Sequence, residues 1–98
     1  MTFSIPRPNV IESDEGFSVE AVREGPGLVS VRYTEAGRVF SIEAKFLTGP
    51  YLLVIYPISI KDEASPKETV ALDAEERMQI SENIRAAFGF RGYEIQIA

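Results

Sequence analysis

The sequence predicts an α+β domain, with an antiparallel β-meander of about five strands, one helix packed on a face of the sheet and a final C-terminal strand. Apolar and polar residues alternate through much of residues 17–47, which is the pattern of strands in a half-buried sheet. Helical spacing of apolar residues appears at residues 73–88, and a second alternating stretch follows at residues 93–97. Since the strands precede the helix instead of alternating with it, the α+β class is favoured over α/β. A length of 98 residues predicts a single domain, residues 1–98.

The N-terminal part of the sequence is expected to be an extended arm followed by the sheet. Residues 1–10 contain two prolines, which favour an extended arm or an edge segment. Residues 17–60 are predicted to form the antiparallel sheet, with turns that contain glycine and proline between the strands. Four strands are expected there: residues 17–24, 28–34, 38–47 and 51–56. The last of them is continuously apolar, which is typical of a strand covered on both faces.

The helix is predicted at residues 73–88, after a polar surface loop at residues 61–69. Asp73 and Glu76 have the spacing of a capping box, in which the first side chain accepts a hydrogen bond from the amide of the second residue. Gly89 is expected to end the helix in a left-handed conformation. One face is apolar and is expected to pack on the sheet: Ile80, Ile84, Ala87 and Phe88. The opposite, polar face is expected to carry Glu75, Gln79, Glu82 and Asn83.

The composition excludes several classes of chemistry. The chain has 15 acidic and 10 basic residues, a formal charge of −5, and neither cysteine nor histidine. Disulfides, thiolate zinc sites, cysteine nucleophiles and imidazole catalysis are therefore excluded. An acidic surface repels phosphate backbones, so we expect no nucleic-acid partner.

The sequence also lacks the signals of export and of membrane insertion. Residues 1–8 show no basic segment followed by an apolar run, as a signal peptide would. The longest apolar stretch, residues 51–60, is interrupted by Pro57 and is shorter than the roughly 20 residues that span a bilayer. We therefore expect a cytoplasmic protein with no membrane partner.

Motifs that would indicate an enzyme are weak. Adjacent acids fall in turns, in a loop or in the first helical turn, where they are expected to be solvated, at Asp14–Glu15, Asp62–Glu63 and Glu75–Glu76. Residues 25–27 read Gly-Pro-Gly, but they separate two strands and lack the lysine of a phosphate-binding loop. We therefore predict a protein that is not an enzyme and that has no cofactor and no metal site.

Arg77 is the one charged residue inside the apolar arc of the helix, between Ile84 and Phe88. One interpretation is that its stem follows the edge of the core and its guanidinium reaches solvent. The other is that it is held at the boundary of sheet and helix to pair with an acidic strand residue or a ligand carboxylate. The sequence leaves both open.

The acidic residues suggest a binding surface for a basic partner. Residues 1–60 carry seven acids and five bases, whereas residues 61–85 carry seven acids and four bases, so the second region is the more acidic. Acidic surfaces accelerate association with basic proteins by electrostatic steering. The acidic surface is expected either around the hairpin, at Glu35 and Glu43, or in the loop and helix, at Asp62, Glu63, Glu75 and Glu82. The basic candidates for partner binding are Arg38 and Arg77.

Several stretches agree in order and spacing with a known family across roughly residues 11–97. They are residues 16–20, residues 37–43 continuing to 47–50, and residues 73–77, 82–86 and 90–95. In these stretches the chain resembles the immunity protein 74 family of bacterial polymorphic toxin systems. The resemblance implies a small α+β protein that neutralises a cognate toxin by binding it, in the cytoplasm of the cell that makes the toxin. It supplies no catalytic residue.

Two alternatives from other classes stay open. A small ligand-binding domain, or an enzyme that uses carboxylates on an unknown substrate, would show a concave cavity lined by Arg77 or by tyrosine side chains. A structural module would pair with a second copy through a sheet edge and form a homodimer.

Overall fold

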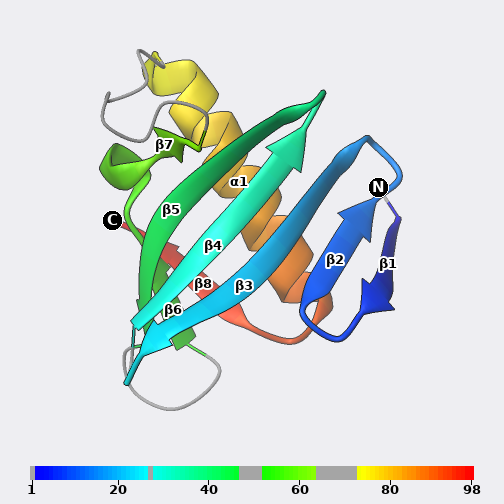
Figure 1. The fold of residues 1–98 in the computed structure, drawn as a ribbon, viewed down its shortest axis with the longest axis horizontal. Coiled ribbons are helices and arrows are strands. Elements are labelled where there is room, and N and C mark those ends of the chain that lie inside the picture. Colours follow the sequence, from blue (N-terminus) through cyan, green and yellow to red (C-terminus); the bar gives the residue numbers. More distant parts are fainter. Residues whose placement is uncertain (1, 27, 47–51, 64–72) are drawn as a thin grey trace.

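A computed structural model describes residues 2–26, 28–46, 52–63 and 73–98. These residues form one mostly antiparallel sheet of eight strands, one α-helix and one short 3-10 helix, which confirms the α+β class (Figure 1). The sheet has more strands than the five or so expected from the sequence. The elements are β1 Phe3–Arg7, β2 Val10–Ser13, β3 Phe17–Gly25, β4 Leu28–Glu35, β5 Arg38–Phe46, β6 Leu52–Ile55, η1 Pro57–Ser59, β7 Lys61–Asp62, α1 Ala74–Phe90 and β8 Glu94–Ile97.

The expected N-terminal arm is in fact a hairpin that extends the sheet. β1 pairs antiparallel with β2, and β2 pairs antiparallel with β3. Val10 and Ile11 are buried, so their apolar side chains hold β2 on the core. Pro6 lies in β1, at the end of the strand order, where a residue without an N–H is tolerated. The two prolines predicted either an extended arm or an edge segment, and the structure shows an edge strand.

The central meander of β3, β4 and β5 confirms the predicted alternation. Antiparallel pairing aligns Val19 with Tyr33 and Val31 with Ile42, and all four side chains are buried on one face. β6 is buried at three consecutive residues, in agreement with the prediction of a strand covered on both faces. β5 is shared, because its first half pairs with the two-residue β7 and its second half with β6. The rest of the expected loop, residues 64–69, lies outside the described residues.

The final strand β8 pairs parallel with β6, from Leu52 opposite Glu94 to Ile55 opposite Ile97. The helix lies between these two strands in the chain, and such a crossover is what a parallel pair requires. The strand order is therefore β1-β2-β3-β4-β5-β6-β8, with β1 and β8 at its two ends.

Helix α1 begins as predicted and ends later than predicted. Oδ1 of the N-cap Asp73 accepts a hydrogen bond of 2.7 Å from the Glu76 amide. The helix runs through Gly89 to Phe90, whose ring lies 5.5 Å from that of Phe3. This contact with β1 favours two more helical residues than predicted, Gly89 and Phe90. The left-handed residue is Gly92, with φ of 86°, so the expectation for Gly89 was wrong.

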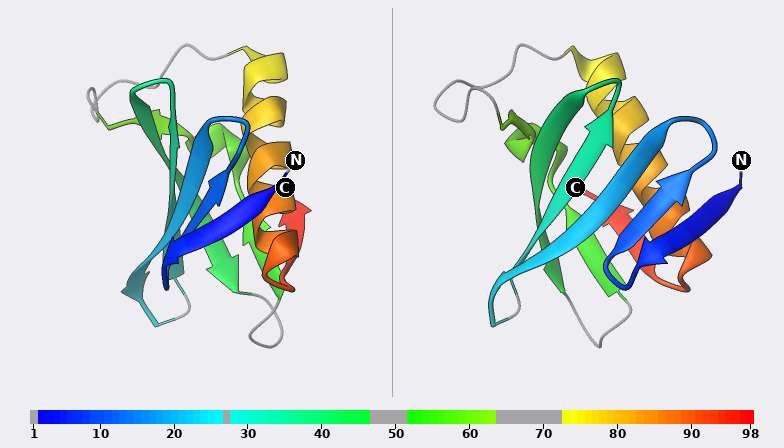
Figure 2. Two further views of the ribbon diagram at one scale, coloured as in Figure 1. Left: turned by 90° about the vertical axis from the view of Figure 1, so that its right-hand side faces the viewer. Right: turned by 45° about the vertical axis from the view of Figure 1, so that its right-hand side comes forward.

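α1 packs on one face of the sheet, which curls around it (Figure 2). The predicted apolar arc is buried, but so are Ser81 and Asn83, on either side of it. Asn83 was expected on the polar face; the curl of the sheet covers a wider stripe of the helix than the apolar arc alone. Across the described residues, no helix combines the length and apolar character needed to cross a bilayer.

Candidate functional site

The eight candidate residues do not form one surface. Glu35 and Arg38 lie at the hairpin between β4 and β5, and Glu43 lies on the face of β5 that points away from α1. The others lie at or just after β7 and along the helix: Asp62, Glu63, Glu75, Arg77 and Glu82. The candidates are therefore divided among different parts of the molecule, and Glu43 lies on the outer face of the sheet, apart from Glu35 at the hairpin.

Ion pairs within the chain engage three of the predicted acids. Glu63 Oε1 lies 3.0 Å from Arg32 Nε, and Glu82 Oε1 lies 3.0 Å from Arg85 Nη1. The Asp62 carboxylate lies 4.0 Å from Arg38. All these pairs are at least partly exposed and contribute little to stability. They do lower the net charge that these acids present to a partner.

Arg77 links the helix to η1. Its Nη1 donates a hydrogen bond of 2.8 Å to the Pro57 carbonyl oxygen. The bond is partly buried and lies at the boundary of helix and sheet. There the guanidinium satisfies a backbone carbonyl that would otherwise need another donor. This contact gives Arg77 a structural role in the positioning of η1.

Glu35 is held by a chain of hydrogen bonds that starts on the helix. Gln79 Nε2 donates to Asn83 Oδ1 over 3.1 Å, and Asn83 Nδ2 donates to the Tyr33 hydroxyl over 2.8 Å. The Tyr33 hydroxyl in turn donates to Glu35 Oε1 over 2.8 Å. Because Asn83 and Tyr33 each accept one of these bonds and donate the next, the bonds polarise one another and fix the direction of the carboxylate.

Tyr33 is the buried member of this chain, with 1% of its surface exposed. Its ring stacks on Phe17 at 5.5 Å between centroids. Burial raises the pKa of the Tyr33 hydroxyl well above its ordinary value; the bond from Asn83 acts in the opposite direction, and Glu35 raises the pKa further. The hydroxyl therefore stays protonated at neutral pH and remains a donor to Glu35.

Glu35 lines three hollows, of about 320, 250 and 230 Å³. They lie between the β2–β3 turn, the β4–β5 hairpin and the first half of α1. Each contains another acidic residue, and we call the four acids together the Glu35 rim: Glu12, Glu15, Glu35 and Glu76. Among the residues that the structure describes, Arg38 is the one basic residue that lines any of the three. Its guanidinium carbon lies 4.7 Å from the centre of the Phe40 ring.

Most of this arrangement was missed in the sequence, where of the rim only Glu35 was a candidate. One signal was present: Glu35 follows the buried Tyr33 by two residues and so lies on the same face of β4. A carboxylate next to an apolar face needs a donor, and the tyrosine hydroxyl is the nearest one. The contributions of Asn83 and Gln79 depend on how the helix docks, which the sequence did not reveal.

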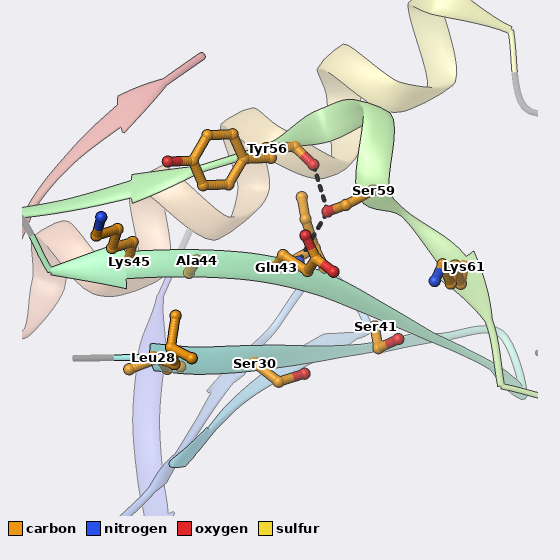
Figure 3. A pocket seen from close by; sticks show the side chains of 11 residues that line it. Leu28, Ser30, Ser41, Glu43, Ala44, Lys45, Tyr56, Ser59 and Lys61 are labelled. Atoms are coloured by element: carbon orange, nitrogen blue, oxygen red, sulfur yellow. Dashed lines mark hydrogen bonds between the residues drawn. The ribbon is translucent and has the colours of Figure 1, made fainter. Parts of the chain in front are cut away.

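A concavity of about 460 Å³ lies on the outer face of β4 and β5, away from α1 (Figure 3). The short helix η1 forms one wall, between the two strands that share β5. The Glu43 amide donates to Ser59 Oγ over 2.8 Å, and the Glu43 carbonyl accepts from the Tyr56 amide over 3.0 Å. Ser59 Oγ also donates to the Tyr56 carbonyl over 2.6 Å. The backbone under this concavity is therefore fixed.

Within the described ranges, no three acidic side chains gather closely enough to hold a metal ion. Comparison with known proteins gives no further guidance, because neither a family model, nor a curated protein, nor a solved structure matches this chain. The geometry of the Glu35 rim and of the outer concavity is therefore the basis for a functional assignment.

Proposed function

We propose that this chain is an immunity-type protein that binds and neutralises a cognate bacterial toxin by protein–protein contact in the cytoplasm. The observation that carries the proposal is the Glu35 carboxylate, held by the buried Tyr33 at the shared border of three hollows. The resemblance to the immunity protein 74 family supports the same assignment.

The Glu35 rim suits a basic protein partner. A carboxylate that is already oriented loses little side-chain entropy when a lysine or arginine of the toxin binds it. The hollows next to Glu35 give room for such a side chain. Glu12, Glu15 and Glu76 add negative charge around it, which steers a basic partner toward this end of the molecule.

Neutralisation by contact needs no catalysis by this chain. The protein has none of the residue types that supply imidazole or thiolate chemistry. In this proposal it acts stoichiometrically by covering a surface of the toxin. The remaining candidates, Glu43, Asp62, Glu63, Glu75, Arg77 and Glu82, would contribute outside the rim or through the positioning of η1.

Co-expression in a bacterial host tests the function. The toxin candidate is the C-terminal domain of a large reading frame next to the gene for this chain. We expect that domain alone to stop growth and this chain to restore it. We expect Glu35→Lys to raise the dissociation constant roughly 10- to 100-fold and to abolish rescue, because it places a cation where the partner's cation binds.

Glu94→Lys is the matched control, since it makes the same charge change at an exposed position of β8, outside the three hollows. It should rescue growth as well as the wild type. Three results would contradict the proposal. They are the absence of a toxin domain in the neighbouring frame, failure of this chain to restore growth, and equal rescue by both variants.

A ligand-binding domain is the second candidate, because Tyr56 lines the outer concavity, as that alternative required. A homodimer paired through a sheet edge remains a third candidate, at β1 or β8. Light scattering at micromolar concentration tests it: a monomer excludes the dimer at that concentration.

A further inference from the structure

The outer concavity carries charges that the chain leaves available. Lys45, Glu43 and Lys61 line it, and among the described residues none of them forms an ion pair. The neighbouring Arg32, on the same face of the sheet, is instead paired with both Glu20 and Glu63. Two cations and one anion are thus unmatched in a single hollow, which leaves it with a net positive charge in an acidic protein.

These charges have a regular spacing. Glu43 and Lys45 lie two residues apart on β5, so their side chains project from the same face and their Cα atoms lie about 7 Å apart. Lys61 lies beyond Glu43, because β7 pairs it with Ser41 (Figure 3). The order across the concavity is therefore positive, negative, positive. Ser59 of η1 holds the N–H of Glu43, and Tyr56, the N-cap of η1, holds its carbonyl, so this order does not depend on a loose backbone.

The rest of the lining is suited to a small amphipathic molecule. Leu28, on β4, is 53% exposed although it is apolar, and the Tyr56 ring lies on the other side of β5, so the two offer apolar surface on either side of Lys45. Ser30 and Ser41 add hydroxyl groups on the neighbouring strands. The volume of about 460 Å³ falls in the range of small-molecule sites.

We propose that this concavity binds a short zwitterion of dipeptide length, with its ammonium group at Glu43 and its carboxylate at Lys45. An extended dipeptide separates its terminal charges by about 7 Å, which matches the spacing of these two residues. In a free α-amino acid only two bonds join the nitrogen to the carboxyl carbon, so its charges lie roughly 2.5 Å apart and cannot match both positions. The dipeptide side chains would cover Leu28 and Tyr56. The site lies on the outer face, and this inference does not rest on the proposed toxin binding.

Titration of the ¹⁵N-labelled protein with the dipeptide Leu-Leu tests the proposal. We expect saturable changes in the amide signals of residues 28–30, 41–45 and 56–61. N-acetylation of the dipeptide removes the ammonium group, and C-amidation removes the carboxylate. Each change should weaken binding roughly three- to fivefold, which is the size of effect that an exposed ion pair gives.

Two variants assign the charges to residues. Glu43→Gln keeps the shape of the side chain and should abolish the preference for Leu-Leu over its N-acetyl form. Lys45→Met should abolish the preference over the C-amide. Glu94→Gln, on β8 and outside the concavity, is the carboxylate control and should leave both preferences intact.

The proposal is overturned by any of four results. The first is the absence of a saturable change up to about 10 mM peptide, which is well above the millimolar dissociation constant expected of so few contacts. The others are changes confined to other residues, equal binding of the capped and free dipeptides, and preferences that survive in both variants. If the same amide signals shift with protein concentration alone, the face is a contact between copies of the chain, which equally contradicts a dipeptide site.

Discussion

Glu35 and Glu43 lie on the same meander, and both were candidates from sequence, but the fold treats them in opposite ways. The Glu35 carboxylate is fixed by the Tyr33 hydroxyl, which is itself fixed by Asn83 on the helix. Glu43 is fixed through its backbone, by Ser59 and Tyr56, while its carboxylate has no ion pair among the described residues. A carboxylate can thus be oriented by a hydrogen bond from a buried side chain, or it can project without such a bond from a strand whose backbone is fixed. Mutations in the two cases should differ in their effect on the free energy of unfolding.

The largest expected loss of stability follows from a mutation in the hydrogen-bond chain that orients Glu35. Asn83→Ala removes the donor to Tyr33 and the acceptor for Gln79 at a position only 8% exposed. It should lower the free energy of unfolding by about 2–3 kcal/mol, since it leaves buried polar groups unsatisfied and a small cavity. Urea denaturation measures this. A loss below about 0.5 kcal/mol, the range of ordinary surface substitutions, would show that the hydrogen-bond chain does not stabilise the fold.

Tyr33 should make the free energy of unfolding depend on pH. Its pKa is raised in the folded state, so the stabilisation is fully present below the unfolded-state pKa of about 10 and is lost as the pH rises toward the folded-state value. The free energy of unfolding should fall above that pH by up to about 1.4 kcal/mol per pH unit. Tyr33→Phe should be less stable at pH 7 by about 1–2 kcal/mol, and should lack this part of the alkaline decline. Parallel pH profiles of the two proteins would refute the assignment.

On the outer face, Ser59→Ala should have a smaller effect. It removes the bonds that Ser59 Oγ makes to the Glu43 amide and the Tyr56 carbonyl. We expect a loss of about 0.5–1.5 kcal/mol, because water can replace part of these partly exposed bonds. The amides of Glu43 and Tyr56 should also exchange with solvent faster. Unchanged exchange would mean that η1 does not hold this part of β5.

The smallest effect is expected for Glu43→Gln. An exposed carboxylate without a described partner should change the free energy of unfolding by no more than about 0.5 kcal/mol. A substantially larger loss would show that the Glu43 side chain stabilises the fold, and Glu43 would then not differ from Glu35 in this respect. The measurement is the same urea titration as for Asn83→Ala.

The parts of the fold that depend on local pattern were predictable. The alternation in β3, β4 and β5 set the buried face of the meander, and the spacing of Asp73 and Glu76 set the helix start. The N-terminal hairpin was not predicted, because two prolines in ten residues are compatible with both an arm and an edge strand. The parallel pairing of β8 with β6 joins segments about forty residues apart, and periodicity within a segment carries no information on its neighbour.

The candidate sites were predictable only as single residues. Glu35 and Glu43 were both identified, but the partners that distinguish them come from distant elements. Asn83 reaches Tyr33 across fifty positions of sequence. It was assigned to the polar side of the helix, because the curl of the sheet determines how wide a stripe is buried. Lys45 and Lys61 were not candidates, because the concavity that they share forms only when β7 pairs with β5.

Mapping the toxin-bound surface by NMR shows directly whether the toxin binds at the Glu35 rim. The probe is a catalytically inactive form of the toxin domain encoded next to this chain, added to the ¹⁵N-labelled protein. We expect the largest amide changes at residues 12–17, 34–38 and 76–83, around the Glu35 rim, and we expect Glu35→Lys to remove them. Changes centred on the outer face of β5, or a footprint unaffected by Glu35→Lys, would contradict it.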